Sequence, residues 1–382
     1  MRAVVYRGIN DLRLETVPVP RIGADELLVK VAVCGVCPTD IKKIHYGTVP
    51  PPRIFGHETA GTIVKIGGGK NGGASVPASR FRVGDRVALH HHVPCLKCHE
   101  CRHASFAQCE TYKRTGITAG FEPAGGGYAE YVRVMDFVLP GVVKIPARNS
   151  FEEGAMLEPV NTVLKAVKRL NLLRGDNVLV AGQGPIGLMF TKILQLRGVN
   201  VLATDLLESR LKLAKKFGAK WVGQASRLSL NEKKIKNEDR RDACPASLDA
   251  AIVAVPSDDA VAQALRLVRG GGQVLLFAHT KRASSFSLSA RRTGGEGRGE
   301  VEAFNLDLSS ICLDEKDLIG SYSSDFTLQA EVARLVFSRR LDVRPLITHR
   351  FPLEETSEAV HLASNPKPDS LKIVVAADVS PL

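Results

Sequence analysis

Short apolar runs rich in β-branched residues, separated by glycine and proline, fill the first 150 residues of the chain. Clear examples cover residues 27–33, 61–66 and 129–134. Runs of this length bounded by Gly and Pro favour β-strands. The pattern therefore predicts a mostly β domain over residues 1–150.

The pattern changes after Pro146, where strand-like runs begin to alternate with helical stretches. Ser150 and Glu153 have the spacing of a capping box, which marks the start of a helix. Strands that alternate with helices of about ten residues favour a doubly wound parallel sheet, so we expect an α/β domain over 151–320. The expected strands are 177–181, 199–204, 248–255 and 273–278, and the expected helices are 186–196, 209–217 and 260–268. Beyond residue 321 the pattern predicts a helical stretch, then 345–352 and a last strand at 372–376.

The composition is that of an ordinary globular protein, with 44% hydrophobic and 24% charged residues. No run of about 18 apolar residues, the length that spans a bilayer, occurs in it. The first residues continue directly into a strand-like run and lack the pattern of a secretion signal. Eight cysteines are too sparse for a disulfide scaffold in so long a chain. We therefore expect a cytoplasmic protein with no membrane partner.

The formal net charge of +12 raises the question of nucleic-acid binding. The basic residues are mostly scattered, and the densest group lies in a Ser- and Gly-rich stretch at 280–300. That composition is typical of a solvated insertion. Because neither interleaved aromatic residues nor a recognition motif accompanies the charge, nucleic acid is not an expected partner.

The strongest chemical signal is a group of four cysteines within fifteen residues, Cys95, Cys98, Cys101 and Cys109. Zinc prefers a tetrahedral set of thiolates, and a closed set of four leaves no position for substrate. The spacing therefore predicts a structural zinc site rather than four buried free cysteines.

A second set of metal-ligand types is dispersed along the chain and comprises Cys37, His57, Glu58 and Glu158. Thiolate, imidazole and carboxylate are suitable ligands for a catalytic zinc, which needs about three protein ligands and one open position. Each residue alone is a weak signal, because a Gly-His-Glu triplet also occurs in turns and Glu158 precedes a proline at a helix junction. Their occurrence together with the four cysteines favours a second, catalytic zinc.

A glycine-rich motif, Gly182-Gln-Gly184-Pro185-Ile186-Gly187, follows the expected strand 177–181 and opens an expected helix. In this context the first glycine makes a tight turn, the second lets pyrophosphate approach the backbone, and the third permits close helix packing. Pro185 suits the first helical turn. The motif predicts a dinucleotide site at the helix N-terminus.

Asp205 stands at the end of the next expected strand, where a carboxylate accepts hydrogen bonds from ribose hydroxyls and repels a 2′-phosphate. This position favours NAD over NADP. The alternative for Asp205 is an ordinary helix N-cap. Arg210, five residues later, either reaches a 2′-phosphate, stacks near adenine or faces solvent.

With these sites the chain resembles the zinc-containing medium-chain alcohol dehydrogenases, especially their sorbitol and threonine dehydrogenase branch. Gly56-His57-Glu58-x-x-Gly61-(x5)-Gly67 is similar to the family signature, and 95–109 is similar to its structural-zinc lobe. Residues 318–322 and 347–352 also resemble the family.

The resemblance implies Cys37 and His57 as catalytic-zinc ligands, with Glu158 where classical alcohol dehydrogenases have a cysteine. Glu58 matches a residue close to the metal that exchanges as a ligand in some members. Thr39 matches the hydroxyl residue that takes the substrate proton. Lys42 departs from the family, which usually has a relay histidine there.

Three roles for Lys42 stay open at this stage. An unperturbed lysine has a pKa of about 10.4 and is already protonated at pH 7, which favours a role in anchoring NAD over proton relay. The alternatives are a solvent-facing side chain and a relay restored by a lowered pKa. Cys34, Cys244 and Cys312 match no metal position, and we expect them to be buried small residues.

The resemblance also implies the architecture and the activity. The fold is a GroES-like catalytic domain, completed by residues 321–382, and a Rossmann domain. The reaction is oxidation of a secondary alcohol or polyol, or of a primary alcohol to an aldehyde, by hydride transfer to NAD, with two zinc ions per chain. The assembly is a homodimer or homotetramer. The alternatives are an aldehyde or ketone reductase that uses the same site, and a non-catalytic regulatory relative that binds NAD.

Overall fold

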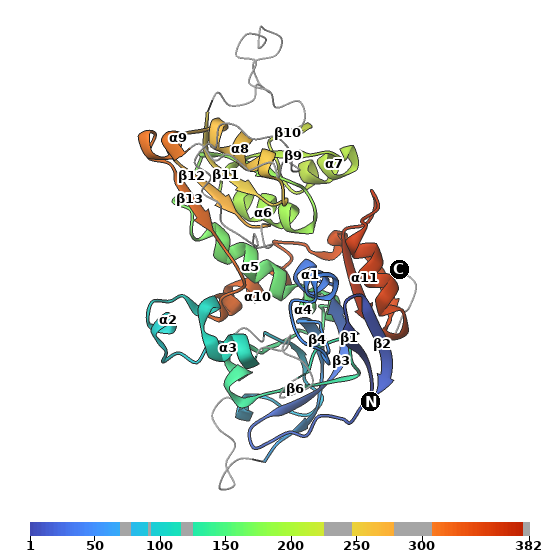
Figure 1. The fold of residues 1–382 in the computed structure, drawn as a ribbon. Helices are drawn as coiled ribbons and strands as arrows, with labels where there is room; N and C mark the ends of the chain where they lie inside the picture. Colours follow the sequence, from blue (N-terminus) through green and yellow to red (C-terminus); the bar gives the residue numbers. More distant parts are fainter. Residues whose placement is uncertain (69–77, 91–92, 116–124, 225–246, 279–307, 377–382) are drawn as a thin grey trace, which may run out of the picture.

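The computed structural model describes residues 1–68, 78–90, 93–115, 125–224, 247–278 and 308–376. The basic stretch at 280–300 and Cys244 lie outside these described residues. The molecule has two lobes, each built around one sheet, with a helical layer between them (Figure 1). No helix of the described part is long and apolar enough to cross a membrane.

The upper lobe in Figure 1 contains a six-stranded parallel sheet with the strand order β10-β9-β8-β11-β12-β13. Numbered along this sheet alone, that order is 3-2-1-4-5-6, the Rossmann order, and it confirms the predicted doubly wound α/β fold. The strands are β8 (Asn177–Ala181), β9 (Asn200–Asp205), β10 (Trp221–Gln224), β11 (Leu248–Val253), β12 (Val268–Leu276) and β13 (Asp317–Gly320). The helices are α6 (Pro185–Leu196), α7 (Glu208–Lys216), α8 (Asp258–Leu267) and α9 (Leu308–Leu313).

The lower lobe contains a mixed seven-stranded sheet with the order β14-β15-β3-β4-β5-β7, and β6 pairs with β3. The strand β15, near the C-terminus, pairs antiparallel with β3, with Val374 opposite Gly35. The end of the described chain therefore returns to the lower lobe, which contains the first 150 residues. The strands are β3 (Leu27–Gly35), β4 (Glu58–Ile66), β5 (Arg86–Ala88), β6 (Tyr131–Val134), β7 (Val143–Lys144), β14 (Ile347–Pro352) and β15 (Lys372–Ala376). A separate hairpin contains β1 (Arg2–Gly8) and β2 (Asp11–Thr16).

The remaining helices belong to the lower lobe or lie between the two lobes. They are α1 (Pro38–Tyr46), α2 (His99–Arg102), α3 (Glu110–Thr115), α4 (Phe151–Ala155), α5 (Leu157–Val167), α10 (Gln329–Phe337) and α11 (Thr356–Ser364). Short 3-10 turns are η2 (Ala78–Arg80), η3 (Phe106–Gln108), η5 (Asp136–Gly141), η7 (Phe326–Leu328), η8 (Arg344–Leu346) and η9 (Leu353–Glu355).

Helix α5 lies between the lobes and packs on α6 and α10 (Figure 1). It follows α4, whose predicted capping box is present: Ser150 Oγ accepts the N–H of Glu153, and the Glu153 carboxylate accepts the N–H of Ser150. Apolar residues of α5 belong to one buried cluster with residues of β3, β4 and β8. Because this core is continuous, the two lobes hold the residues between them in fixed positions.

The prediction for the three unassigned cysteines is right in one case and wrong in another. Cys34 in β3 is fully buried, whereas Cys312 in α9 is exposed. The physical reason is that α9 is a six-residue helix with no buried residue, so nothing covers the thiol.

Candidate active site

A cavity of about 440 Å³ lies between the two lobes, and several of the predicted site residues line it. Its walls come from α1, β4, α5, the start of α6, α7 and the chain after β12. The segment 321–323 and the start of β15 complete it. Clefts at the carboxyl ends of parallel strands are common ligand sites, and β8 and β11, where the strand order reverses, both end near this cavity.

Cys37, His57 and Glu58 come together at one end of the cavity. Their ligand atoms all lie within 4.8 Å of one another. Cys37 is the N-cap of α1, just after β3, whereas Glu58 begins the neighbouring strand β4 and His57 directly precedes it. Because β3 and β4 are antiparallel with Gly35 opposite Glu58, residues twenty positions apart become neighbours. A thiol, an imidazole and a carboxylate at this spacing fit a zinc ion.

Asp40 supports this group, although the sequence analysis did not select it. Its side chain is fully buried on the first turn of α1, and its Oδ2 lies 2.9 Å from His57 Nδ1 and accepts the N–H of Gly56 at 3.2 Å. Burial opposes a charge on the imidazole, but Asp40 and Cys37 together raise the pKa of His57 well above its ordinary value. The carboxylate orients the ring through Nδ1 and leaves Nε2 for a metal. Its position three residues after Cys37 on a helix was the available signal.

Glu158 lines the same cavity from the first turn of α5, but it is not among the three residues whose ligand atoms cluster. The side chain is buried. Burial, reinforced by the nearby charge of Glu58 and opposed by His57, raises the pKa of Glu158 to about 7. The structure therefore places Glu158 in the electrostatic environment of the cluster.

Lys372 is a second residue that the sequence analysis missed. It begins β15, is almost fully buried, and forms an ion pair with the Glu58 carboxylate. Its Nζ also donates to the carbonyl of Val36 at 2.9 Å. A buried lysine requires such partners, and Lys372 holds Glu58 close to Cys37 and His57.

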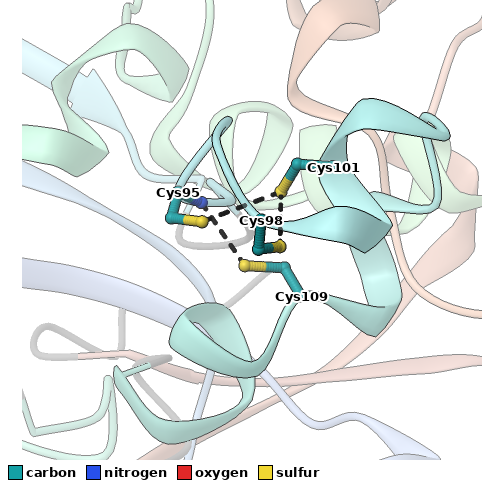
Figure 2. Close-up of side chains that lie close together, drawn as sticks. All are labelled: Cys95, Cys98, Cys101 and Cys109. Carbon is teal, nitrogen blue, oxygen red and sulfur yellow. Dashed lines mark hydrogen bonds between the residues drawn. The ribbon is translucent and has the colours of Figure 1, made fainter.

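The four predicted thiols form a compact cluster in which the sulfur atoms point toward one another (Figure 2). All four are free, and their ligand atoms lie within 4.8 Å of one another. Cys98 Sγ lies 3.3 Å and Cys95 Sγ lies 3.9 Å from Cys101 Sγ, and the N–H of Cys95 donates to Cys109 Sγ at 3.4 Å. The set is closed and consists only of sulfur, which fits a structural zinc ion.

The segment that carries these cysteines, residues 93–115, is called here the cysteine lobe. It contacts residues 323–326, which follow β13 and connect the upper lobe to the lower lobe. The ring of Phe106 meets Phe326 edge to face at 5.5 Å, and the Tyr112 hydroxyl lies 3.2 Å from Ser323 Oγ. The cysteine lobe is therefore attached to the cavity wall.

The glycine-rich turn has the geometry that its sequence predicts. Gly182 has a φ of +92°, and a Cβ at Gly187 would lie 1.8 Å from the Gly182 carbonyl oxygen. Gly184 is the N-cap of α6 and Pro185 its first residue, and both line the cavity together with Ile186. The positive end of α6 thus faces the cavity, as an anionic ligand requires.

The Asp205 carboxylate accepts the N–H of Gln183 at 2.7 Å and the N–H of Leu207 at 2.9 Å. Leu207, not Asp205, is the N-cap of α7, so Asp205 is not an ordinary helix cap. Arg210 lines the cavity, with its Nη1 3.9 Å from Asp205 and its Nη2 3.5 Å from the carbonyl of Ser370. The two charges therefore lie side by side near the glycine-rich turn.

Thr39 and Lys42 both line the cavity from α1. Lys42 is partly buried, and its Nζ donates across the cavity to the carbonyl of Ala278 at 3.4 Å. Burial lowers its pKa below the ordinary value. This position on the cavity wall differs from the solvent-facing alternative.

Comparison with known proteins agrees with this geometry. Residues 23–147 match the alcohol dehydrogenase GroES-like domain, and residues 185–336 match the zinc-binding dehydrogenase domain. A sorbitol dehydrogenase of Bombyx mori is 31% identical over 374 residues, which cover 95% of each protein. The chain belongs to the zinc-dependent medium-chain dehydrogenases. Within that family it falls in the sorbitol dehydrogenase-like branch.

Two further relatives show the range of this family. D-xylulose reductase A of Aspergillus oryzae is 28% identical over 94% of this chain and 92% of its own length. The crystal structure of a zinc-binding dehydrogenase from Sinorhizobium meliloti, bound to NADP, is 25% identical, with a TM-score of 0.77 and 98% coverage of both chains. The family is therefore shown over nearly the whole chain, and the fold agrees.

Proposed function

We propose that this dehydrogenase oxidises a secondary alcohol or a polyol to a ketone, or a primary alcohol to an aldehyde, with NAD as the hydride acceptor. The observation that carries the proposal is one cavity lined by Cys37, His57 and Glu58 and by the N-terminus of α6. Zinc, when bound, lowers the pKa of a coordinated hydroxyl, and the nicotinamide of NAD accepts a hydride.

The residues have distinct roles in this proposal. Cys37, His57 and Glu158 would hold the catalytic zinc, and Glu58, paired with Lys372, would stay beside it as an exchangeable ligand. Thr39, from the first turn of α1, would accept the proton of the substrate hydroxyl. The four cysteines of the cysteine lobe, Cys95, Cys98, Cys101 and Cys109, would hold the second, structural zinc.

The cavity lies between two functional units of the chain. We assign residues 1–150 and 321–382 to the catalytic unit and 151–320 to the NAD-binding unit. The pairing of β15 with β3 supports the first assignment, and the contiguous Rossmann sheet supports the second.

An assay of NADH formation with a panel of alcohols and polyols, together with zinc analysis, tests the proposal. We expect turnover with at least one secondary alcohol or polyol and about two zinc ions per chain. The same assay run from ketone and NADH measures the reductase direction. The alternative is the regulatory relative. In that case the zinc-replete protein would oxidise no alcohol and reduce no ketone, and it would bind DNA in an electrophoretic mobility shift assay at physiological salt.

The choice of NAD rests on Asp205, although the Sinorhizobium meliloti neighbour is described with NADP. The Asp205 carboxylate, held by two backbone N–H groups beside the glycine-rich turn, would repel a 2′-phosphate. We expect kcat/KM to favour NAD over NADP by about a hundredfold or more. Asp205→Ser should reduce this preference for NAD. If the unchanged enzyme used both cofactors equally, Arg210 and not Asp205 would determine which ribose the site accepts.

For Lys42 we propose a role in anchoring NAD, because its ammonium group lies on the cavity wall near Ala278. Lys42→Ala should weaken NAD binding about tenfold, the loss of one charge-assisted hydrogen bond, and leave the single-turnover hydride rate nearly unchanged. A hydride rate reduced a hundredfold with unchanged NAD affinity would identify Lys42 as the proton relay.

We further propose a cytoplasmic homodimer or homotetramer. In the described part of the chain β13 pairs on one side only, with β12, and its Leu318 is partly exposed. An unpaired strand edge with apolar side chains favours pairing with a second copy. Light scattering coupled to size exclusion measures the mass, and a monomer at micromolar concentration would exclude this assembly.

A further inference from the structure

The cysteine lobe carries a pair of histidines that neither of the proposed zinc sites uses. His99 begins α2, and His103 is its C-cap residue, four positions later. The N–H of His103 donates to the carbonyl of His99 at 3.2 Å, which is the hydrogen bond of an α-helical turn. Because residues four apart lie on the same face of a helix, the two side chains are neighbours.

The two imidazole rings are close enough to share one ligand. Their centroids lie 4.5 Å apart, and the ring planes are tilted by 55°. Both residues are exposed, and neither ring forms a hydrogen bond within the described residues. Two histidines at this spacing on one helix face are a zinc-binding arrangement, and imidazole also suits copper and nickel. The pair is therefore available to a divalent transition metal from solvent.

The histidine pair is separate from the four-thiol cluster, although both use the same helical turn. Cys101 lies between the two histidines in sequence, but it is buried, and its Sγ lies 3.3 Å from Cys98 Sγ. Its thiol points toward the other three cysteines (Figure 2). Helix α2 thus directs a thiol into the cysteine lobe and exposes two imidazoles on its surface.

The environment of the pair indicates metal binding without hydrolysis. Residues 99–103 read His-Glu-Cys-Arg-His, a spacing in which the glutamate of metalloproteases acts as a general base. Here neither histidine nor Glu100 lines the cavity between the lobes. No third histidine, cysteine or carboxylate ligand atom joins the pair in the described part of the chain. Water would fill the remaining positions, so a metal bound there would exchange readily.

We propose that His99 and His103 form an additional, exposed site that binds one divalent transition metal ion such as zinc. The site goes beyond the proposed dehydrogenase function, since it lies outside the cavity and is not needed for turnover. With only two protein ligands it binds zinc more weakly than the four thiols do. Desalted protein therefore keeps the two zinc ions proposed above and takes up a third when zinc is in excess.

Calorimetric titration of zinc chloride into the desalted enzyme, whose two zinc ions are first confirmed by metal analysis, measures this site. We expect about one further zinc ion per chain, bound with micromolar affinity. His99→Gln and His103→Gln should each weaken this binding about tenfold or more, because each removes one of two protein ligands. His361→Gln is the matched control and should bind the further zinc normally, since His361 is a single exposed histidine on α11.

Chemical labelling of the unchanged enzyme gives a second measurement that does not depend on a variant. Diethyl pyrocarbonate modifies exposed imidazoles, and mass spectrometry identifies each modified residue. Excess zinc should protect His99 and His103 from the reagent and leave His361 reactive. This pattern distinguishes the pair from any other histidine that binds the further zinc.

Three results would overturn the proposal. The first is a two-zinc enzyme that takes up no further zinc, and the second is a further zinc that both variants bind as tightly as the unchanged enzyme. The third is equal labelling of His99 and His103 with and without zinc, which decides the question even if a variant fails to fold. All three are measured without turnover, so a failure of the proposed dehydrogenase function would be seen separately, in the NADH assay.

Discussion

The two candidate metal sites are built in opposite ways. The cysteine cluster draws all its ligands from residues 95–109, so a short segment determines it. The other candidate site joins Cys37 at the start of α1 with His57 and Glu58 at the start of β4, so it forms only once β3 and β4 have paired, and Glu158 lines the same cavity from the first turn of α5. The comparison indicates that the first site depends on one short segment, whereas the second depends on the pairing of two strands.

The burial of the two regions agrees with this difference. Within the cysteine lobe, α2 is four residues long and only Cys101 of that helix is buried. A segment with so little apolar core depends on its metal to fold. At the cavity, by contrast, His57, Glu58, Asp40 and Glu158 are all buried, and a continuous apolar core lies beside them.

The largest expected effect comes from Cys37→Ala. It removes a proposed zinc ligand from the second site and leaves the buried Asp40–His57 pair intact. We expect kcat/KM to fall by about a thousandfold or more, because zinc supplies several kcal/mol of transition-state stabilisation, while the melting temperature changes little. Cys34→Ala, three residues earlier, is the matched control and should keep both zinc and activity. Comparable activity of Cys37→Ala and the unchanged enzyme would remove Cys37 from the metal site.

The two sites should lose their zinc to a chelator at different rates. Zinc with an open coordination position should leave to a chelator about a hundredfold faster than zinc in a closed four-thiolate site. Activity should vanish with the first zinc and return when zinc is added, while hydrogen exchange in residues 95–113 stays protected. Simultaneous loss of both metals would show that the two sites are equally open.

Cys98→Ala should mainly affect the structure of the cysteine lobe and should affect catalysis less. We expect one zinc instead of two, faster hydrogen exchange in the cysteine lobe, and a fall in kcat/KM of about tenfold, since the chemistry at Cys37 and His57 is left in place. Zinc analysis, exchange mass spectrometry and kinetics measure these effects. A complete loss of activity with an ordered lobe would make this cluster part of the catalytic machinery.

The smallest effect is expected from Glu158→Cys. Carboxylate and thiolate are both suitable ligands in an open zinc site, so metal content should persist and kcat/KM should fall by less than about tenfold. Glu158→Ala, which leaves no ligand atom, should instead lower zinc affinity measurably in a competition titration. Equal zinc affinity of both variants would place Glu158 outside the coordination shell.

The same contrast explains how far the sequence predicted the molecule. The cysteine cluster and the glycine-rich turn were predicted well because their geometry is local, and the strand at 177–181 was located without error. The strand predicted at 273–278 begins instead at Val268, because three consecutive glycines, Gly270 to Gly272, interrupted its apolar pattern.

Residues that become neighbours only through strand pairing were harder to find. Lys372 reaches Glu58 because β15 lies beside β3, which no spacing along the chain reveals. Asp40 was within reach of sequence reasoning, since helical spacing places it close to Cys37.

The pairing of β15 with β3 also has a consequence for biosynthesis. The Rossmann sheet is contiguous in sequence and can form as the nascent chain leaves the ribosome, whereas β3 acquires its last neighbour only when residues 372–376 emerge. At about 5–20 residues per second, the edge of β3 stays open for tens of seconds during translation. An open strand edge favours aggregation, so we expect the lower lobe to be most prone to aggregation while the chain is still being synthesised.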